Sequence, residues 1–197
     1  MTARSARVLL VLTAFTLGLV LFMGAAFLVR SQNASAPGPS AVGGAFKLVD
    51  QDGKTVTDET MKGKPFLVFF GFTHCPDICP TALFEVSEVL TKLGPDADRV
   101  GALFVTVDPE RDTSAKLKDY LSSFDPRLRA LTGDEAAVMA MTKAYRVYSK
   151  KVPLQGGDYT MDHTALVYLM DKQGRFVKPF GLKRPPEEAA AELKKYL

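Results

Sequence analysis

The sequence predicts an α/β domain with a mixed β-sheet covered by helices on both faces, an N-terminal β-hairpin, and one transmembrane helix ahead of it. Three observations support this fold class. Two nearly continuous apolar runs, residues 65–72 and 100–107, are typical of strands buried on both faces. Amphipathic helical patterns alternate with such strands, and hairpin patterns flank them. Strands that alternate with helices favour helices packed on both faces of one sheet.

The N-terminal apolar segment predicts a membrane anchor. Residues 8–29 carry no charge and number 22, which as a helix suffices to cross a hydrocarbon core of about 30 Å. Arg4 and Arg7 precede the segment and only Arg30 follows closely, so the positive-inside bias places the N-terminus in the cytoplasm. Residues 34–36 offer an Ala-x-Ala cleavage pattern, but the apolar region of a signal peptide is usually about 7 to 15 residues long. We therefore expect an anchor that is not cleaved.

The chain is expected to have four parts. No Arg-rich mitochondrial transit peptide fits ahead of the anchor, which indicates a bacterial inner (plasma) membrane with the domain on the periplasmic side. A Ser-, Ala-, Pro- and Gly-rich stretch after the anchor is typical of a flexible linker. The parts are a cytoplasmic N-terminus at residues 1–7, the anchor at 8–29, the linker at 30–44 and the folded domain at 45–197.

The charge balance excludes a nucleic-acid-binding function. The chain has 25 Lys and Arg against 22 Asp and Glu, and three of the arginines lie within residues 1–36, which contain no acidic residue. The remainder is neutral overall and lacks the clustered positive charge that such binding requires.

The first half of the domain begins with a hairpin and continues with alternating elements. Residues 46–49 and 54–57 flank the turn Gln51-Asp52-Gly53. The strand at 65–72 leads to a helix at 81–93, where apolar residues recur every three or four positions before Gly94-Pro95.

The second half continues the alternation. The strand at 100–107 precedes helices at 113–124, capped by Thr113 or Ser114, and at 134–145. Then follow a short strand at 147–153, a hairpin with strands at 164–170 and 175–180, and a helix opened by Pro185-Pro186 that runs to residue 197.

The chemistry centres on two cysteines four residues apart. Cys75 and Cys79 lie between a buried strand and a helix, and Pro80 must lie in the first helical turn because it lacks a backbone donor. Both sulfurs then lie at the positive end of a helix, where thiolates are stabilised. Two thiolates suit Cu(I), zinc or an iron–sulfur cluster, and they also suit reversible disulfide chemistry. The cysteines alone leave metal binding and redox chemistry open.

A histidine supplies the expected third ligand. His74 adjoins Cys75 and points to the opposite face of extended backbone, which disfavours its joining the same ion. His163 lies just before the strand at 164–170, where loops of an α/β sheet converge. Cys75, Cys79 and His163 would form a three-coordinate Cu(I) site, which can hold Cu(II) if an outside ligand completes it.

Three segments resemble the Sco/SenC family of copper-delivery proteins. They are residues 70–80 (FGFTHCPDICP), residues 107–112 (VDPERD) and Asp162-His163, and the resemblance covers the chain from about Ala45 to Leu197. It implies a thioredoxin-like fold with an added hairpin and one copper ion per chain, bound by Cys75, Cys79 and His163. It also implies assembly of the binuclear copper centre of cytochrome c oxidase subunit II, with copper supplied by a donor protein. Asp162 is implied to orient or tune His163.

A thiol–disulfide oxidoreductase is the alternative function. One cysteine thiolate of the Cys75–Cys79 pair would act as nucleophile and the other would resolve the mixed disulfide, reducing the copper-ligand cysteines of the oxidase. The usual thioredoxin-like motif places two residues between its cysteines rather than three, and this function has no use for His163.

Other candidate residues receive structural interpretations. Asp77 is expected to cap the following helix or to lie in a turn, and the loop at 108–112 is expected to be structural or to contact a partner. Met139 and Met170 are expected in the core rather than on copper.

Overall fold

The computed structural model describes residues 13, 15–25 and 41–197. The chain divides into two units, residues 1–39 and residues 40–197, and each is considered separately. Residues 15–25 of the first unit are helical. Within the described residues no helix has the length and apolar character needed to cross a membrane. Residues 8–12, 14 and 26–29 of the predicted anchor and residues 30–40 of the predicted linker lie outside them.

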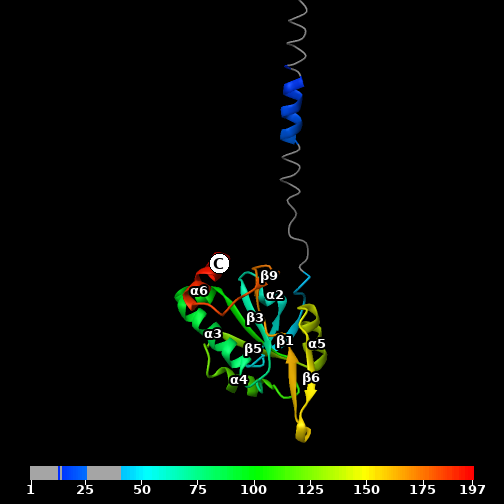
Figure 1. Ribbon diagram of the computed structural model, residues 1–197, viewed down its shortest axis with the longest axis vertical. Helices are drawn as coiled ribbons and strands as arrows, with labels where there is room; N and C mark the ends of the chain where they lie inside the picture. The colour runs from blue at the N-terminus through cyan, green and yellow to red at the C-terminus, as the bar shows by residue number, and fades with distance from the viewer. Residues whose placement is uncertain (1–12, 14, 26–40) are drawn as a thin grey trace, which may run out of the picture. The chain divides into compact units, whose positions relative to one another are not determined.

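The second unit consists of nine strands and five helices that Figure 1 shows in ribbon form. The strands are β1 (Lys47–Asp50), β2 (Thr55–Thr57), β3 (Phe66–Gly71), β4 (Gly101–Thr106), β5 (Leu128–Thr132), β6 (Ser149–Pro153), β7 (Tyr159–His163), β8 (Val167–Met170) and β9 (Phe176–Pro179). The helices are α2 (Asp58–Met61), α3 (Ile78–Leu93), α4 (Ser114–Leu121), α5 (Glu135–Ala144) and α6 (Pro186–Leu193), with short 3-10 segments at Gly94–Arg99, Gln155–Gly157 and Lys194–Tyr196.

A seven-stranded mixed sheet forms the centre of the domain. Its order is β2-β1-β5-β4-β3-β8-β9. The strands β3, β4 and β5 run parallel, whereas β8 pairs antiparallel with β3 and β9 antiparallel with β8. The order β4-β3-β8-β9, with α3 between β3 and β4 and α6 after β9, is the thioredoxin-like arrangement. The hairpin β1–β2 extends the opposite edge through β5.

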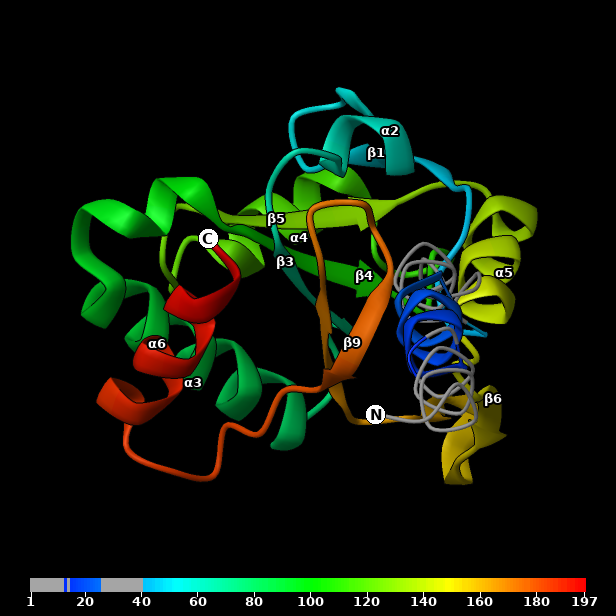
Figure 2. The same ribbon diagram turned by 90° about the horizontal axis from the view of Figure 1, so that it is seen from above.

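Helices cover both faces of this sheet, as predicted. All six residues of β3 and all six of β4 are buried, because successive side chains point to opposite faces and both faces are packed. Phe104 on β4 contacts Tyr120 of α4, with ring centroids 5.8 Å apart, on the face that also carries α3 and α6. Phe70 points the other way and contacts Tyr145 at the end of α5, at 5.5 Å. Figures 1 and 2 show α3 and α6 on one side of the sheet and α5 on the other.

Three segments meet at one edge of the sheet because of strand direction. The parallel strands β3 and β4 end there at Gly71 and Thr106, and the antiparallel β8 begins there at Val167, opposite Phe69. The loop after β3, the loop after β4 and the chain that enters β8 therefore converge. This convergence was expected from the sequence, and it brings Cys75 and His163 to the same edge.

The structure corrects the expected strands in two places. A strand, β5, lies between the second and third main helices, where none was predicted, and its Ala130 and Leu131 are fully buried. His163 does not precede the hairpin strand directly. It ends β7, which pairs with β6 in a separate two-stranded sheet in the register Ser149↔His163 to Pro153↔Tyr159. The strand at 159–163 was missed because none of its side chains is buried, so it lacks the continuous apolar run that marks β3 and β4.

The end of β3 approaches α3 so closely that only glycine fits at residue 71. A Cβ atom on Gly71 would lie 2.7 Å from Cys79 Sγ and 2.7 Å from Phe104 Cε2. Both contacts are far shorter than van der Waals separation, and each partner is packed in the core. The backbone of β3 therefore packs directly against the buried side chain of Cys79.

We expect Gly71→Ala to lower the free energy of unfolding of residues 40–197 by about 1–3 kcal/mol, because the added methyl group overpacks a filled site. Urea denaturation measures this change. Gly181→Ala is the matched control, since no atom lies within 4 Å of a Cβ at Gly181. Equal stability of the two variants would contradict the close-approach argument.

Candidate metal centre

The two cysteines occupy different environments although they are four residues apart. Cys75 lies in the loop before α3 and its N–H donates to the Phe72 carbonyl oxygen at 3.2 Å. Cys79 lies in the first turn of α3, and its N–H points at Cys75 Sγ at 3.4 Å. Cys75 is partly exposed and Cys79 is fully buried, and both are free thiols. The helix N-terminus thus directs a backbone dipole at the outer sulfur.

His163 approaches the cysteines from the hairpin β6–β7. Its Nε2 atom lies 3.8 Å from Cys79 Sγ, and its Nδ1 atom lies 3.1 Å from the carbonyl oxygen of Thr164. A carbonyl oxygen only accepts, so Nδ1 carries the proton and Nε2 presents its lone pair to the sulfur. Phe69 and Phe72 pack edge-on against the imidazole, with centroid distances of 6.4 Å and 5.7 Å. The ring therefore has a defined tautomer and orientation.

The three side chains form one candidate metal site. One ligand atom each from Cys75, Cys79 and His163 lies within 4.8 Å of the other two. With metal–sulfur bonds of about 2.3 Å and metal–nitrogen bonds of about 2.1 Å, trigonal ligands lie about 3.8 Å apart. The distance between Cys79 Sγ and His163 Nε2 has that value. A soft S₂N set suits Cu(I).

Burial controls the protonation of the inner thiol. Desolvation raises the pKa of Cys79 well above its ordinary value, and the hydrogen bond with Cys75 adds to this effect. Burial likewise raises the pKa of the Tyr120 hydroxyl. Cys79 is consequently a neutral thiol unless a cation compensates its charge.

We expect Cys79 in the reduced, metal-free protein to react with iodoacetamide at least about tenfold more slowly than after denaturation, because the thiolate is the reactive form and its pKa is raised. The rate should still be rising with pH at about pH 9, above the usual pKa of a free cysteine. Fragment mass spectrometry locates the label, and Cys75 serves as the internal comparison. Rapid labelling of Cys79 at neutral pH would contradict the assigned environment.

Asp112 fastens the cysteine loop to the sheet. Its carboxylate is fully buried and accepts hydrogen bonds from Thr73 N at 3.0 Å, Thr73 Oγ1 at 2.6 Å and Thr106 Oγ1 at 2.7 Å. Thr73 lies two residues before Cys75, and Thr106 ends β4. The buried charge is thus balanced by three donors from two strand ends.

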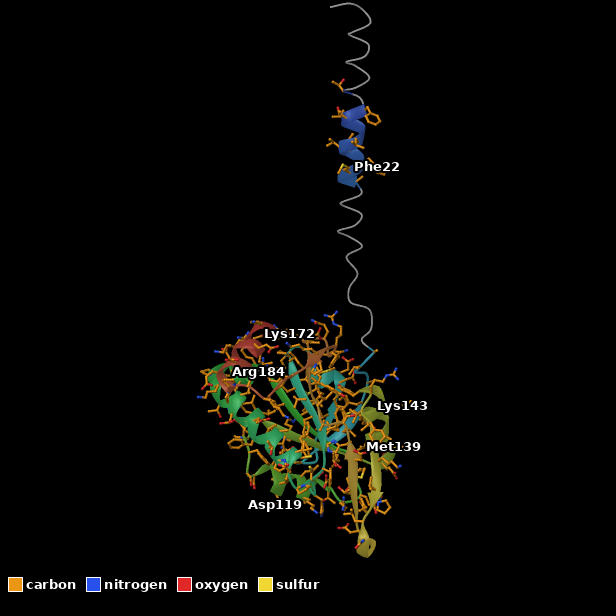
Figure 3. All side chains as sticks on the ribbon, viewed as in Figure 1. Phe22, Asp119, Met139, Lys143, Lys172 and Arg184 are labelled. Carbon is orange, nitrogen blue, oxygen red and sulfur yellow. The ribbon has the colours of Figure 1, made fainter. Side chains whose placement is uncertain are left out.

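We expect Asp112→Ala to lower the free energy of unfolding by about 3–5 kcal/mol, because three buried donors lose their acceptor. Urea denaturation of residues 40–197 measures the loss. Asp119→Ala, on the exposed surface of α4 (Figure 3), should change stability by less than about 0.5 kcal/mol. Similar values for both variants would show that Asp112 does not fasten the loop.

The same loop fastens the hairpin that carries His163. Arg111 donates from Nε to Asp108 at 2.5 Å and from Nη1 to the Tyr159 carbonyl oxygen at 2.9 Å. Its guanidinium carbon lies 3.7 Å from the centroid of the Tyr159 ring, and the Tyr159 hydroxyl donates to Asp108 at 2.9 Å. Lys151 stacks near the same ring and pairs with Glu110. The interpretation of residues 108–112 as a structural loop agrees with these contacts.

The remaining histidine and acidic candidates lie outside the group. His74 is exposed, with Nε2 3.3 Å from Lys116 Nζ. The exposed side chain of Asp162 forms no hydrogen bond to His163 within the described residues, and Thr164 occupies the Nδ1 position instead. Asp77 is the N-cap residue of α3, yet among the residues that the structure describes its carboxylate accepts only from the Thr81 hydroxyl, at 3.5 Å.

The expectation that Met139 lies in the core is wrong. Its side chain is 60% exposed on the outer face of α5 (Figure 3), because the apolar stripe of that helix is formed by Val138 and Met141. Met170 is fully buried, as predicted. The loop at 108–112 was predicted to be structural or to contact a partner, but Arg111 and Asp112 were not predicted to support the metal centre. The sequence feature that could have indicated this role is the group of charged residues directly after the buried strand β4.

Comparison with known proteins agrees with this architecture. The sequence model described as SCO1/SenC matches residues 34–197. The chain belongs to the SCO1/SenC family. Among curated SCO relatives, an Arabidopsis thaliana protein named SCO1 homolog 1, mitochondrial, is 40% identical over 145 residues, covering 73% of this chain but only 43% of that protein. A SCO2-like protein of Rickettsia felis is 38% identical over 155 residues, covering 78% of this chain and 76% of that protein.

Solved structures of SCO proteins share the fold. ScoI of Bradyrhizobium japonicum, determined with copper bound, is 66% identical with a TM-score of 0.78, and the match covers 79% of this chain and 99% of that one. Yeast Sco1 with copper bound is 38% identical with a TM-score of 0.70, covering 81% and 91% of the two chains.

Proposed function

We propose that this protein is a copper metallochaperone that binds one copper ion through Cys75, Cys79 and His163. The grouping of two sulfurs and one nitrogen within 4.8 Å carries the proposal, because this ligand set suits Cu(I). The SCO relatives whose structures are described with copper bound support it.

The proposed cellular role is assembly of the binuclear copper centre of cytochrome c oxidase subunit II. A related structure is described as a member of the Sco family of cytochrome c oxidase assembly proteins. In this role the protein would be held by its N-terminal segment in a bacterial inner membrane, with the domain on the periplasmic side. It would receive copper from a donor protein and pass it on by ligand exchange. The uncharged run at residues 8–29 and the flanking arginines support this placement.

The environments of the two sulfurs suit ligand exchange. Cys75 is the more accessible sulfur, whereas Cys79 is buried and the His163 ring packs against Phe69 and Phe72. An incoming thiolate can replace Cys75 while Cys79 and His163 still hold the ion. Asp162 remains a proposed tuning residue whose exposed side chain could act only through the field at His163.

An anaerobic Cu(I) titration of the reduced protein against a competing chelator tests the site. We expect one tight equivalent, whose affinity falls by about 10- to 100-fold in His163→Ala and further in Cys75→Ser and Cys79→Ser, because each change removes a direct ligand. His74→Ala is the matched control and should bind as the parent does. Binding that is indifferent to His163 would sink the third-ligand assignment.

Thiol–disulfide exchange is the second candidate, favoured by the proximity of the two free sulfurs. In that reaction the Cys75 thiolate attacks a substrate disulfide, Cys79 resolves the mixed disulfide, and the substrate leaves with two reduced thiols while the Cys75–Cys79 pair becomes oxidised. One relative's structure is described by a disulfide switch. The same titration separates the candidates, since a pure oxidoreductase would show no tight copper equivalent.

A further inference from the structure

Tyr120 on α4 carries a buried hydroxyl group that has no hydrogen-bond partner among the residues that the structure describes. A buried polar group without a partner costs free energy and is rare in folded proteins. The ring is held on two sides, by Phe104 with ring centroids 5.8 Å apart and by Phe124 at 5.5 Å. Packing therefore fixes the phenol inside the domain, and its unpaired hydroxyl requires a physical explanation.

Tyr120 and the buried thiol of Cys79 pack against the same side chain, Phe104. The Tyr120 ring contacts the Phe104 ring, and Phe104 Cε2 and Cys79 Sγ would each lie 2.7 Å from a Cβ atom at Gly71. The two residues therefore lie on the same face of the sheet, one on α4 and the other in the first turn of α3. The phenol is a neighbour of the inner ligand of the candidate metal centre.

The charged groups that act on the Tyr120 hydroxyl belong to the metal centre and its support. Burial raises the pKa of this hydroxyl, and negative charge on Cys79, Cys75 or Asp112 raises it further, in that order. The hydroxyl therefore stays protonated and is available as a donor. Asp112 already accepts three hydrogen bonds, and Cys75 is partly exposed. Cys79 is the buried group that remains as an acceptor.

We propose that Tyr120 is a positioning residue of the metal centre, whose hydroxyl donates a hydrogen bond to Cys79 Sγ when a bound copper ion holds that sulfur as a thiolate. The proposal rests on the proposed function. A neutral thiol is a weak acceptor, which agrees with an unpaired hydroxyl beside a free thiol. Hydrogen bonds to a charged acceptor are roughly twice as strong as neutral ones. The donor therefore favours the charged form of the inner ligand and the retention of the ion.

The test uses Tyr120→Phe in the full-length protein in detergent, a change that removes only the hydroxyl. Tyr145→Phe is the matched control, because it removes a hydroxyl whose pKa is also raised by burial, next to Phe70 on the opposite face of the sheet. Each variant is characterised by its Cu(I) affinity in chelator competition and by the urea midpoint of the reduced, metal-free protein. The energy of the thiolate-to-copper charge-transfer band after loading with Cu(II) is the third measurement.

We expect Tyr120→Phe to lower the Cu(I) affinity by about tenfold, because a hydrogen bond to a charged sulfur is lost. The urea midpoint of the metal-free protein should be no lower than that of the parent, since that form loses no hydrogen bond. The charge-transfer band should move to lower energy, because the sulfur lone pair is no longer stabilised by a donor. Tyr145→Phe should bind copper with the parental affinity and leave the band in place.

Parental copper affinity in Tyr120→Phe would overturn the hydrogen bond and leave the proposed function intact. A charge-transfer band that stays in place would also overturn it, even if the affinity fell. A loss of affinity with a lower urea midpoint and an unmoved band would show that Tyr120 only supports the fold. A parent that binds no Cu(I) would instead overturn the proposed function itself.

Discussion

The buried carboxylate of Asp112 is the interaction on which the geometry of the metal centre depends. Cys79 and His163 are 84 residues apart, one on α3 and the other on β7 of the two-stranded sheet, so no single element positions both. Asp112 holds the cysteine loop through Thr73, and its neighbour Arg111 holds the hairpin through Tyr159. One short loop after β4 therefore fixes the separation of the ligands. A two-stranded hairpin is marginal by itself in water, which makes this attachment necessary for a defined imidazole position.

Cys79 is buried and Cys75 is partly exposed, so the two sulfurs have different roles at the metal centre. Cys79 lies over the backbone of Gly71 and beside Phe104, where a thiolate without a counter-charge is costly. A bound cation removes that cost, so metal binding and loss of the thiol proton are coupled. Cys75 lies nearer to solvent under the N-terminus of α3, where backbone dipoles favour negative charge. The inner sulfur thus favours retention of an ion, and the outer one favours exchange with ligands from outside.

The sequence predicts those elements of the fold that are determined by interactions between residues close together in the chain. The apolar runs that became β3 and β4, the helix stop at Gly94 and the Thr113 cap are local signals, and the structure has each of them. The strand β7 was missed because its pairing with β6 crosses a loop and its burial is partial. The supports of the site were missed for a related reason. Nothing in the sequence near Asp112 shows that Thr73 will lie 3.0 Å away, because that contact depends on the parallel register of β3 and β4.

The position of His163 is what separates this site from an ordinary thiol pair on a thioredoxin-like fold. Such a fold serves many functions, so the fold alone decides little. Thiol–disulfide exchange needs two sulfurs at a helix N-terminus and no imidazole lone pair. Here the Thr164 carbonyl oxygen fixes the proton on Nδ1, and the free Nε2 faces Cys79 Sγ at 3.8 Å, the spacing of two ligands on one trigonal ion. If Cys75 and Cys79 formed a disulfide, His163 Nε2 would have no ligand function. A metal ion uses all three atoms, and for that reason the geometry favours copper binding over disulfide exchange as the primary function.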